Sequence, residues 1–319
     1  MIAPVPVPNA SGFAYQYLNF GEMRNKGIEI GFTLVPLQLQ NGLKWEIYTS
    51  FTKNKSDVVS LISGVERLNL ANLGVAVTPV IEPGYAYGSF RGSYALRDSK
   101  GDMVIDPVTG FPFTAQDEKI IGNPNPDFVM GITNTVSFKG FTLSALWDWR
   151  KGGDIYSVTI ASELGRGVTK DTEDREHSWI IPGVYGDAQG NLVLDASGNP
   201  IANRTQITTN DLYFYGGGTE TTFAINSAAE FNIWDATVYR LREVSLGYDL
   251  PKKWIQKAKI GRINISVTGR NLWYFAPNVP SHTNFDPDIN NYGSSNVQGI
   301  DLSCAPTSRR YGVNLKVTF

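Results

Sequence analysis

The most suggestive spacing of chemical groups in this chain is a run of acidic and amide side chains near its C-terminal end. Asp286, Asp288 and Asn290 stand at alternate positions, like the first oxygen ligands of an EF-hand calcium loop. The sixth position holds Asn291 where that loop needs glycine, and the twelfth holds Val297 where it needs glutamate. We therefore expect a turn-rich loop rather than a metal site, with a cation site as the open alternative.

The other reactive side chains stand apart from one another. His177 and His282 have no carboxylate or cysteine at ligand spacing, so neither indicates a zinc site. Cys304 is the sole cysteine, which excludes an internal disulfide and a CxxC motif. No Ser/His/Asp, Cys/His or paired-carboxylate pattern stands out in a chain with 30 acidic residues. The sequence predicts neither catalysis nor a cofactor, and a hydrolase with loop-borne carboxylates is the weakest alternative.

The composition favours a β-rich protein. The net charge is −2, and a nucleic-acid partner would require a concentrated basic surface that is not apparent here. Charged residues make up 18%, against about 25% in a typical soluble domain. Glycine (32 residues) and aromatic residues (12%) are abundant. No apolar run approaches the roughly 18 residues that a membrane-spanning helix needs, so a helical membrane protein is excluded.

Apolar and polar residues alternate with a period of two in seven segments, which therefore read as strands with one apolar and one polar face. In the last segment Tyr311, Val313 and Leu315 lie on one side and Asn314 and Lys316 on the other. In the fifth segment the alternation changes parity, and we expect a one-residue β-bulge near its middle, at position 242. The seven segments are residues 27–34, 43–53, 128–138, 141–149, 239–250, 263–271 and 311–319.

The connections between these segments alternate between short and long. The expected short turns are residues 35–42, 139–140 and 251–261, and the expected long loops are residues 54–127, 150–235 and 272–310. Strict alternation of this kind is typical of an antiparallel, up-and-down transmembrane β-barrel with short periplasmic turns and long extracellular loops. Residues 1–26 are expected to be the end of a further extracellular loop.

Seven strands leave the barrel incomplete. Bacterial barrels normally have an even number of strands, and two bare strand edges would expose unpaired backbone groups to hydrocarbon. Each unpaired group costs several kcal/mol, so we expect further strands to complete the sheet.

Several motifs in these segments resemble those of the SusC/RagA-type TonB-dependent transporters, and they occur in family order along the whole chain. In the strand 239–250 and just after it, the sequence YRLREVSLGYDLP closely matches the family's Y-x-R-L-K/R-x-x-x-L-G-Y-x-L-P pattern, from which it differs by lacking the residue between tyrosine and arginine. The other matching segments are NFGEMRNKGIE (19–29), GNPNPD (122–127), WDWRKGGDIY (147–156), GRNL (269–272), FDP (285–287) and the final YGVNLKVTF (311–319).

The resemblance implies an energised importer of glycans or peptides in the outer membrane of a Gram-negative bacterium. Such an importer has a 22-stranded barrel, an internal plug and a TonB box that engages TonB–ExbB–ExbD. A SusD-like surface lipoprotein acts as its lid, and barrel-assembly machinery inserts it into outer-membrane lipid. We expect this chain to be the C-terminal part of such a barrel, without the signal peptide, plug and TonB box.

Candidate contact residues follow from parity and from the loops. Asp148 and Arg150 have the parity of the barrel lumen and are candidates for substrate contact or for charge pairing. Trp147 and Trp149 have the opposite parity and are expected in an aromatic girdle at the membrane surface. In the second long loop, substrate or the lid is expected to meet aromatic rings, unless the loop packs them against itself. These rings are Trp179, Tyr213, Phe214 and Tyr215.

Tyr311 and Phe319, in the last strand, are expected to form the signal for barrel assembly. The main alternative to a barrel is a soluble β-sandwich that binds carbohydrate. A sandwich would bury the apolar face of these strands inside one closed core and would not require long and short loops to alternate.

Overall fold

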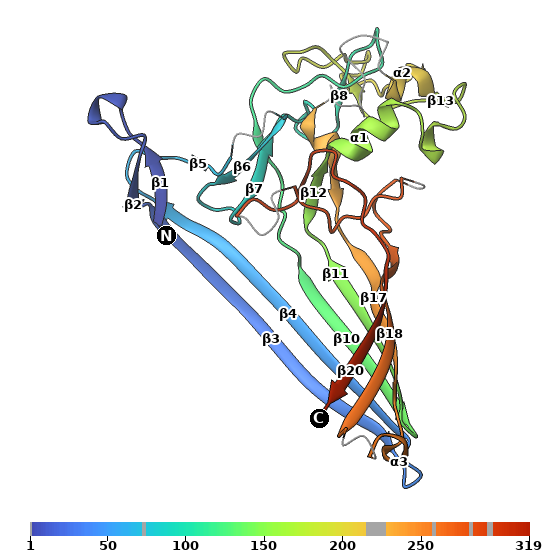
Figure 1. Ribbon diagram of the computed structural model, residues 1–319. Coiled ribbons are helices and arrows are strands. Elements are labelled where there is room, and N and C mark those ends of the chain that lie inside the picture. Colours follow the sequence, from blue (N-terminus) through green and yellow to red (C-terminus); the bar gives the residue numbers. More distant parts are fainter. Residues whose placement is uncertain (1, 72–74, 215–227, 257–259, 281–282, 292–295) are drawn as a thin grey trace.

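A long, slanted sheet and a lobe of short elements at one of its ends make up the chain (Figure 1). The computed structural model describes all residues except 1, 72–74, 215–227, 257–259, 281–282 and 292–295. In the sheet each strand pairs antiparallel with the next sheet strand along the chain. The order is β3–β4–β10–β11–β17–β18–β20, which confirms the predicted up-and-down meander.

The seven sheet strands contain the seven segments that alternate in the sequence, except for one terminal residue each of the second, fifth and seventh segments (Leu43, Leu250 and Phe319). Their bounds are β3 Gly21–Gln38, β4 Lys44–Leu61, β10 Phe128–Phe138, β11 Phe141–Lys151, β17 Val238–Asp249, β18 Arg262–Phe275 and β20 Arg310–Thr318. All three short connections lie at the end of the sheet away from the lobe (Figure 1). At Lys139 and Gly140 both φ angles are positive (47° and 87°), as a two-residue hairpin turn that matches the strand twist requires. The connection from β17 to β18 contains the one-turn helix α3 (Lys252–Ile255).

The predicted bounds of β3, β4, β11 and β18 were wrong at the lobe end. β11 continues to Lys151 and β18 to Phe275, past their expected ends at 149 and 271. β3 and β4 each have 18 residues, so residues 21–26 and 54–61, expected in loops, belong to strands. Residues 2–19, also expected in a loop, contain the hairpin β1 (Ile2–Pro6) and β2 (Tyr15–Asn19), with the turn η1 (Asn9–Ser11) between its strands. Apolar and polar residues alternate only where one face of a strand must be apolar. The backbone pairing of β3 with β4 continues beyond that stretch.

The lobe is built from the three long loops and contains only short elements. A four-stranded antiparallel sheet comes from the first loop: β5 (Leu68–Asn69), β6 (Val77–Ile81), β7 (Ser89–Gly92) and β9 (Lys119–Gly122). A second sheet joins the other two loops through β12 (Asp154–Ser157), β16 (Ile233–Asp235) and β19 (Ile300–Asp301). The two-stranded pairs are β8 (Val104–Ile105) with β14 (Val184–Tyr185), and β13 (Ser178–Trp179) with β15 (Ile207–Thr208).

The helices of the lobe are short as well. They are α1 (Val158–Gly165), α2 (Thr209–Tyr213), η2 (Lys170–Thr172) and η3 (Ala229–Asn232). The N-terminus of α1 is capped by Ser157, whose Oγ accepts a hydrogen bond from Ile160 N (3.0 Å). Asp301 of the third loop adds to this cap, because it accepts hydrogen bonds from Ser157 Oγ (2.7 Å) and Thr159 N (3.0 Å). Among the described residues, no helix is long and apolar enough to cross a membrane.

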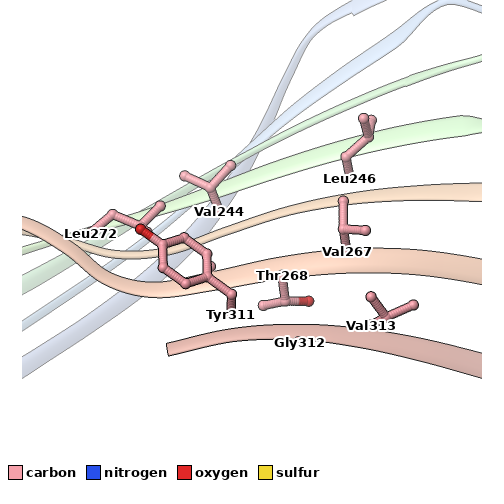
Figure 2. Close-up of a pocket in the computed structure, with 9 residues that line it drawn as sticks. Val244, Leu246, Val267, Thr268, Leu272, Tyr311, Gly312 and Val313 are labelled. Atoms are coloured by element: carbon pink, nitrogen blue, oxygen red, sulfur yellow. The ribbon is translucent and has the colours of Figure 1, made fainter. Parts of the chain in front are cut away.

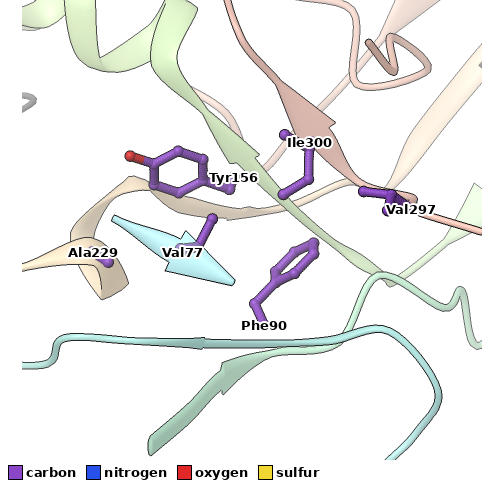
Figure 3. Packing of buried hydrophobic residues seen from close by; sticks show 6 residues of the cluster. All are labelled: Val77, Phe90, Tyr156, Ala229, Val297 and Ile300. Atoms are coloured by element: carbon purple, nitrogen blue, oxygen red, sulfur yellow. The ribbon is translucent and has the colours of Figure 1, made fainter. Parts of the chain in front are cut away.

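The largest buried cluster of side chains joins all three long loops. Figure 3 shows its members, which are Val77 and Phe90 from the first loop, Tyr156 and Ala229 from the second, and Val297 and Ile300 from the third. Phe90, Ala229 and Ile300 have no exposed surface. The lobe is thus a packed unit with its own core and not a set of separate loops.

The apolar face of the long sheet, by contrast, is not buried. Ile28, Phe32 and Leu34 of β3 are 59%, 45% and 52% exposed, and Leu143 of β11 and Leu246 of β17 are 46% and 45% exposed. No second sheet of the described residues lies across this face. A β-sandwich would bury it, so that alternative is not favoured.

Candidate functional site

The polar face of the long sheet is shaped by a β-bulge in β17. The register shifts between Leu241 and Glu243 against β18, and the same stretch of β17 shifts against β11. Arg242 is therefore the extra residue, and the bulge predicted at that position is confirmed. Arg240 lies on the polar face, and the bulged Arg242 also reaches side chains there. Because Arg242 is the extra residue, Glu243 lies on the polar face as well, and the alternation after the bulge has the opposite parity.

Arg240 forms a buried ion pair with the third loop. Its two terminal nitrogens donate to the two carboxylate oxygens of Asp286, at 2.6 and 2.5 Å, and the two side chains are 2% and 1% exposed. Thr307 Oγ1 also donates to Asp286 (2.8 Å). Burial alone would raise the pKa of Asp286, but the Arg240 guanidinium outweighs it and holds this pKa below its usual range.

Arg242 extends this interaction to a neighbouring strand. Its Nη1 donates to Asp288 (2.8 Å), and its Nε donates to Asp148 of β11 (3.1 Å). We call the set Asp148, Arg240, Arg242, Asp286 and Asp288 the arginine clamp. It fastens the third loop to the polar face of the sheet with two-point, charge-assisted hydrogen bonds.

The arginine clamp accounts for the calcium-like spacing seen in the sequence. The carboxylates of Asp286 and Asp288 are taken up by guanidinium groups. Within the part of the chain that the structure describes, no group of three His, Cys, Asp or Glu side chains is arranged to hold a metal ion. The pairing of Arg240 and Arg242 with the third loop was not predicted from the sequence. The available signals were the position of the two arginines at the expected bulge and the spacing of the two aspartates.

Asp148 and Arg150, predicted to face the lumen, have separate partners. Asp148 belongs to the arginine clamp, whereas Arg150 Nη2 donates to the backbone oxygen of Pro124 (3.0 Å). Gly153 adopts a left-handed conformation (φ 77°) beside this contact, and a Cβ there would lie 2.8 Å from both Arg150 Nη2 and Pro124 O. The chain leaves β11 through this tight crossing, so Arg150 positions the base of the lobe.

Trp179 lies beside a hollow of about 250 Å³ on the lobe. Its Nε1 donates to Thr209 Oγ1 (2.9 Å), and the His177 ring meets it edge-on with 4.6 Å between centroids. The indole is fixed by these contacts yet remains 36% exposed. The hollow is lined by Lys170, Asp171, Glu173, Asp174, His177 and Trp179.

Tyr213 and Phe214 are not among the described residues that line that hollow. Tyr213 packs against two buried clusters, and burial, reinforced by the charge of Asp171, raises its pKa to about 12. The Phe214 ring lies 4.1 Å from the guanidinium carbon of Arg175. Tyr215 lies outside the described residues. Trp179 therefore lines a hollow, while Tyr213 packs within the lobe.

On the apolar face, aromatic rings form a continuous row across five strands at the lobe end of the sheet. Successive ring centroids lie 5.3, 4.8, 5.3 and 6.5 Å apart. Trp147 and Trp273 make a second, edge-on contact (6.1 Å) below this row. We call the row the aromatic belt, and its members are Phe51, Phe128, Trp149, Tyr239 and Phe275.

Near the edge of the sheet, the apolar face carries a hollow of about 440 Å³ between β17, β18 and β20. Figure 2 shows the Tyr311 ring pointing across this hollow toward Leu272. Val244 and Val313 also line the hollow. Tyr311 and Phe319 are 76% and 91% exposed, and β20 is the edge strand. The two residues predicted to signal assembly are thus accessible in this chain.

Comparison with known proteins gives consistent matches. No protein-family model matches the chain. The chain is 26% identical to TonB-dependent receptor P3 of Formosa agariphila over 343 residues, an alignment that covers all of the chain and 31% of the relative. It is 19% identical to TonB-dependent receptor SusC of Bacteroides thetaiotaomicron, covering all of the chain and 29% of the relative. The chain therefore spans about a third of the length of these relatives.

Solved structures agree on the fold. The structure of the RagAB peptide transporter matches all of this chain with a TM-score of 0.60 and 18% identity, over 32% of that chain. The RagAB peptide importer in its open-open state matches with the same TM-score and 20% identity, over 31% of that chain.

Proposed function

We propose that the chain is part of a SusC/RagA-type TonB-dependent receptor and that its sheet forms part of an outer-membrane transport barrel; the similarity to TonB-dependent receptors and to the RagAB fold supports this. In this proposal the apolar face meets lipid and the polar face lines the interior. The parent protein, of which the chain represents about a third, imports glycans or peptides and is not an enzyme. In this proposal energy reaches the parent protein from TonB–ExbB–ExbD.

The observation that carries the proposal is the exposed apolar face bounded by the aromatic belt. The 11 residues of β10 extend roughly 35 Å at about 3.3 Å per residue. At a strand tilt of about 40–45°, this length spans about 25 Å of membrane, which is the usual height of the apolar band of such barrels. The aromatic belt marks one border of the band, and Phe141 against Tyr248 (4.4 Å) lies toward the other.

The orientation follows from the loops. Barrels of this kind place short turns in the periplasm and long loops outside the cell. We therefore place α3 in the periplasm and the lobe at the extracellular mouth, where a SusD-like lipoprotein would close over it. The RagAB structures are those of a peptide transporter, which supports a peptide as the imported molecule, and a glycan is the other class that the sequence resemblance implies. In either case Trp179, Phe214 and Tyr215 are the candidate contacts with substrate or lid, and Asp148 and Arg150 hold the wall beneath them.

The C-terminal strand has a second role in this proposal. Tyr311 and Phe319 are exposed on the edge strand, where barrel-assembly machinery would bind them. Loss of Phe319 is therefore expected to lower the amount of parent protein assembled in the outer membrane.

The transport proposal is tested by deleting the parent gene and growing the strain on defined glycans or on peptides as sole carbon source. We expect growth to fail on one class of substrate and to return when the full-length gene is restored. A gene that lacks residues 1–319 is the control and should not restore growth. Unchanged growth on every source, or rescue by the truncated control, would contradict the proposal.

A further inference from the structure

Two arginines oppose each other directly on the polar face of the sheet. Arg270 of β18 and Arg310 of β20 are partners in the antiparallel register. Both have the parity of the polar face, because the exposed apolar residues Val267 of β18 and Tyr311 of β20 have the opposite parity. Like charges directly opposite across two strands destabilise a sheet, so this pair is not explained by the stability of the fold.

The charges around this pair are unevenly balanced. Arg270 Nε donates to Glu243 Oε2 (2.7 Å), which lies on its other side in β17. Among the described residues, Arg310 makes no ion pair, and its side chain is exposed. Across β17, β18 and β20, the paired positions therefore hold Glu243, Arg270 and Arg310, which is one carboxylate followed by two guanidinium groups.

A hollow of about 380 Å³ lies at this place, and every side chain that lines it is polar or charged. It exists because two irregularities coincide: the bulged Arg242 in β17, and Asn271 in β18, which adopts a left-handed conformation (φ 51°). Arg242 is engaged through Nε and both terminal nitrogens by Asp148 and Asp288. Arg270 is engaged by Glu243 through Nε, so its terminal nitrogens and the guanidinium of Arg310 are left to act on a ligand. The lining residues are Arg242, Glu243, Arg270, Asn271 and Arg310.

We propose that Arg270 and Arg310 form an oxyanion-binding site on the interior wall, which holds a carboxylate, phosphate or sulfate group of the imported molecule. Guanidinium groups bind such planar or tetrahedral anions through paired hydrogen bonds, and arginines lining a pore select for anions. The ligand supplies the negative charge that the row across β17, β18 and β20 lacks. That the anion belongs to an imported molecule rests on the proposed transport function, whereas the binding itself does not.

The site is tested on the purified full-length parent protein in detergent, with inorganic phosphate as the probe and sodium chloride holding the ionic strength constant. We expect phosphate to raise the thermal midpoint of the wild type. Arg310→Gln and Arg270→Gln should each bind phosphate about tenfold more weakly, because each removes one charge-assisted contact.

Arg309→Gln is the matched control. It removes the same charge one residue away, and Arg309 lines a different hollow beside Phe285. It should leave phosphate binding within about twofold of the wild type, a difference too small to reflect a lost contact. Without phosphate, Arg310→Gln should match or exceed the wild-type midpoint, because it relieves the opposed charges.

Glucose 6-phosphate and glucose identify the source of the anion. The proposal expects glucose 6-phosphate to bind at least as tightly as inorganic phosphate and glucose not to bind. Binding of the inorganic ion alone, or equal weakening by Arg309→Gln and Arg310→Gln, would overturn it. If phosphate leaves the thermal midpoint of the wild type unchanged, the proposal is also overturned. That result would indicate that a carboxylate elsewhere in the parent protein neutralises Arg310. None of these readouts depends on import, so they stand apart from the growth test.

Discussion

Asp286 and Asp288 are two residues apart, yet their surroundings give them different energetic weight. Asp286 is buried and accepts two hydrogen bonds from Arg240 and one from Thr307. Asp288 is 37% exposed and meets a half-exposed Arg242. A buried ion pair is costly to break because the remaining charge is left without compensation, whereas an exposed pair contributes little.

We therefore expect Asp286→Asn to destabilise the full-length protein by about 3–5 kcal/mol, the usual cost of breaking a buried pair. Asp288→Asn, the matched control, should cost at most about 1 kcal/mol. The measurement is the temperature at which the folded species is lost in heat-modifiability electrophoresis of each variant. Equal shifts for the two variants would show that burial of the Arg240–Asp286 pair has no special weight.

The crossing from β11 to β12 shows how a single element depends on glycine. Gly152 and Gly153 both adopt left-handed conformations (φ 68° and 77°), and Gly152 N donates to Thr237 Oγ1 (2.9 Å). The chain turns here from the sheet into the lobe, so the crossing sets where β12 begins. Any side chain introduced at Gly153 would strain the backbone, because its φ angle is positive, and would crowd Arg150 and Pro124.

Gly153→Ala is accordingly expected to destabilise the protein by about 2–4 kcal/mol, since it combines left-handed strain of about 1 kcal/mol with overpacking of about 1–3 kcal/mol. Gly101→Ala isolates the strain, because Gly101 also has a positive φ (92°), but a Cβ at that position would have no atom within 4 Å. It should cost only about 1 kcal/mol. Thermal midpoints of the two full-length variants give the comparison, and indistinguishable values would refute the role of crowding at Gly153.

For the whole molecule, the distribution of apolar surface is the reverse of that in a water-soluble protein. The buried hydrophobic side chains gather in the lobe, while the long sheet exposes a row of large apolar residues. In a barrel wall this arrangement is stable, because lipid covers the apolar face and water fills the interior.

A charge placed on either face of β20 distinguishes the two sides. Leu315→Arg, on the apolar face, should cost about 2–4 kcal/mol in the membrane and reduce the assembled full-length protein in outer-membrane fractions. Asn314→Arg, one residue away on the polar face, is the control and should assemble normally. Deletion of Phe319 should lower assembly as well. Normal assembly of Leu315→Arg, or of the Phe319 deletion, would argue against lipid contact or against the assembly signal, respectively.

The long sheet could be predicted from the order of residues alone. Strand identity, the order of short and long connections and the bulge at Arg242 all follow from local alternation, because each residue must face either the apolar or the polar side. The strand ends at the lobe could not be predicted, since β3 and β4 continue pairing where no apolar face is required.

Which side chains meet, in contrast, depends on the folded chain. Arg240 and Asp286 are 46 positions apart, and the core of the lobe joins residues from three loops. Trp179 lines a hollow while Tyr213 is packed away, although both are aromatic residues of the same loop. The opposition of Arg270 and Arg310 likewise depends on the register between two strands. Periodicity reports which face a residue occupies, whereas its partner across space is set by register, bulges and loop packing.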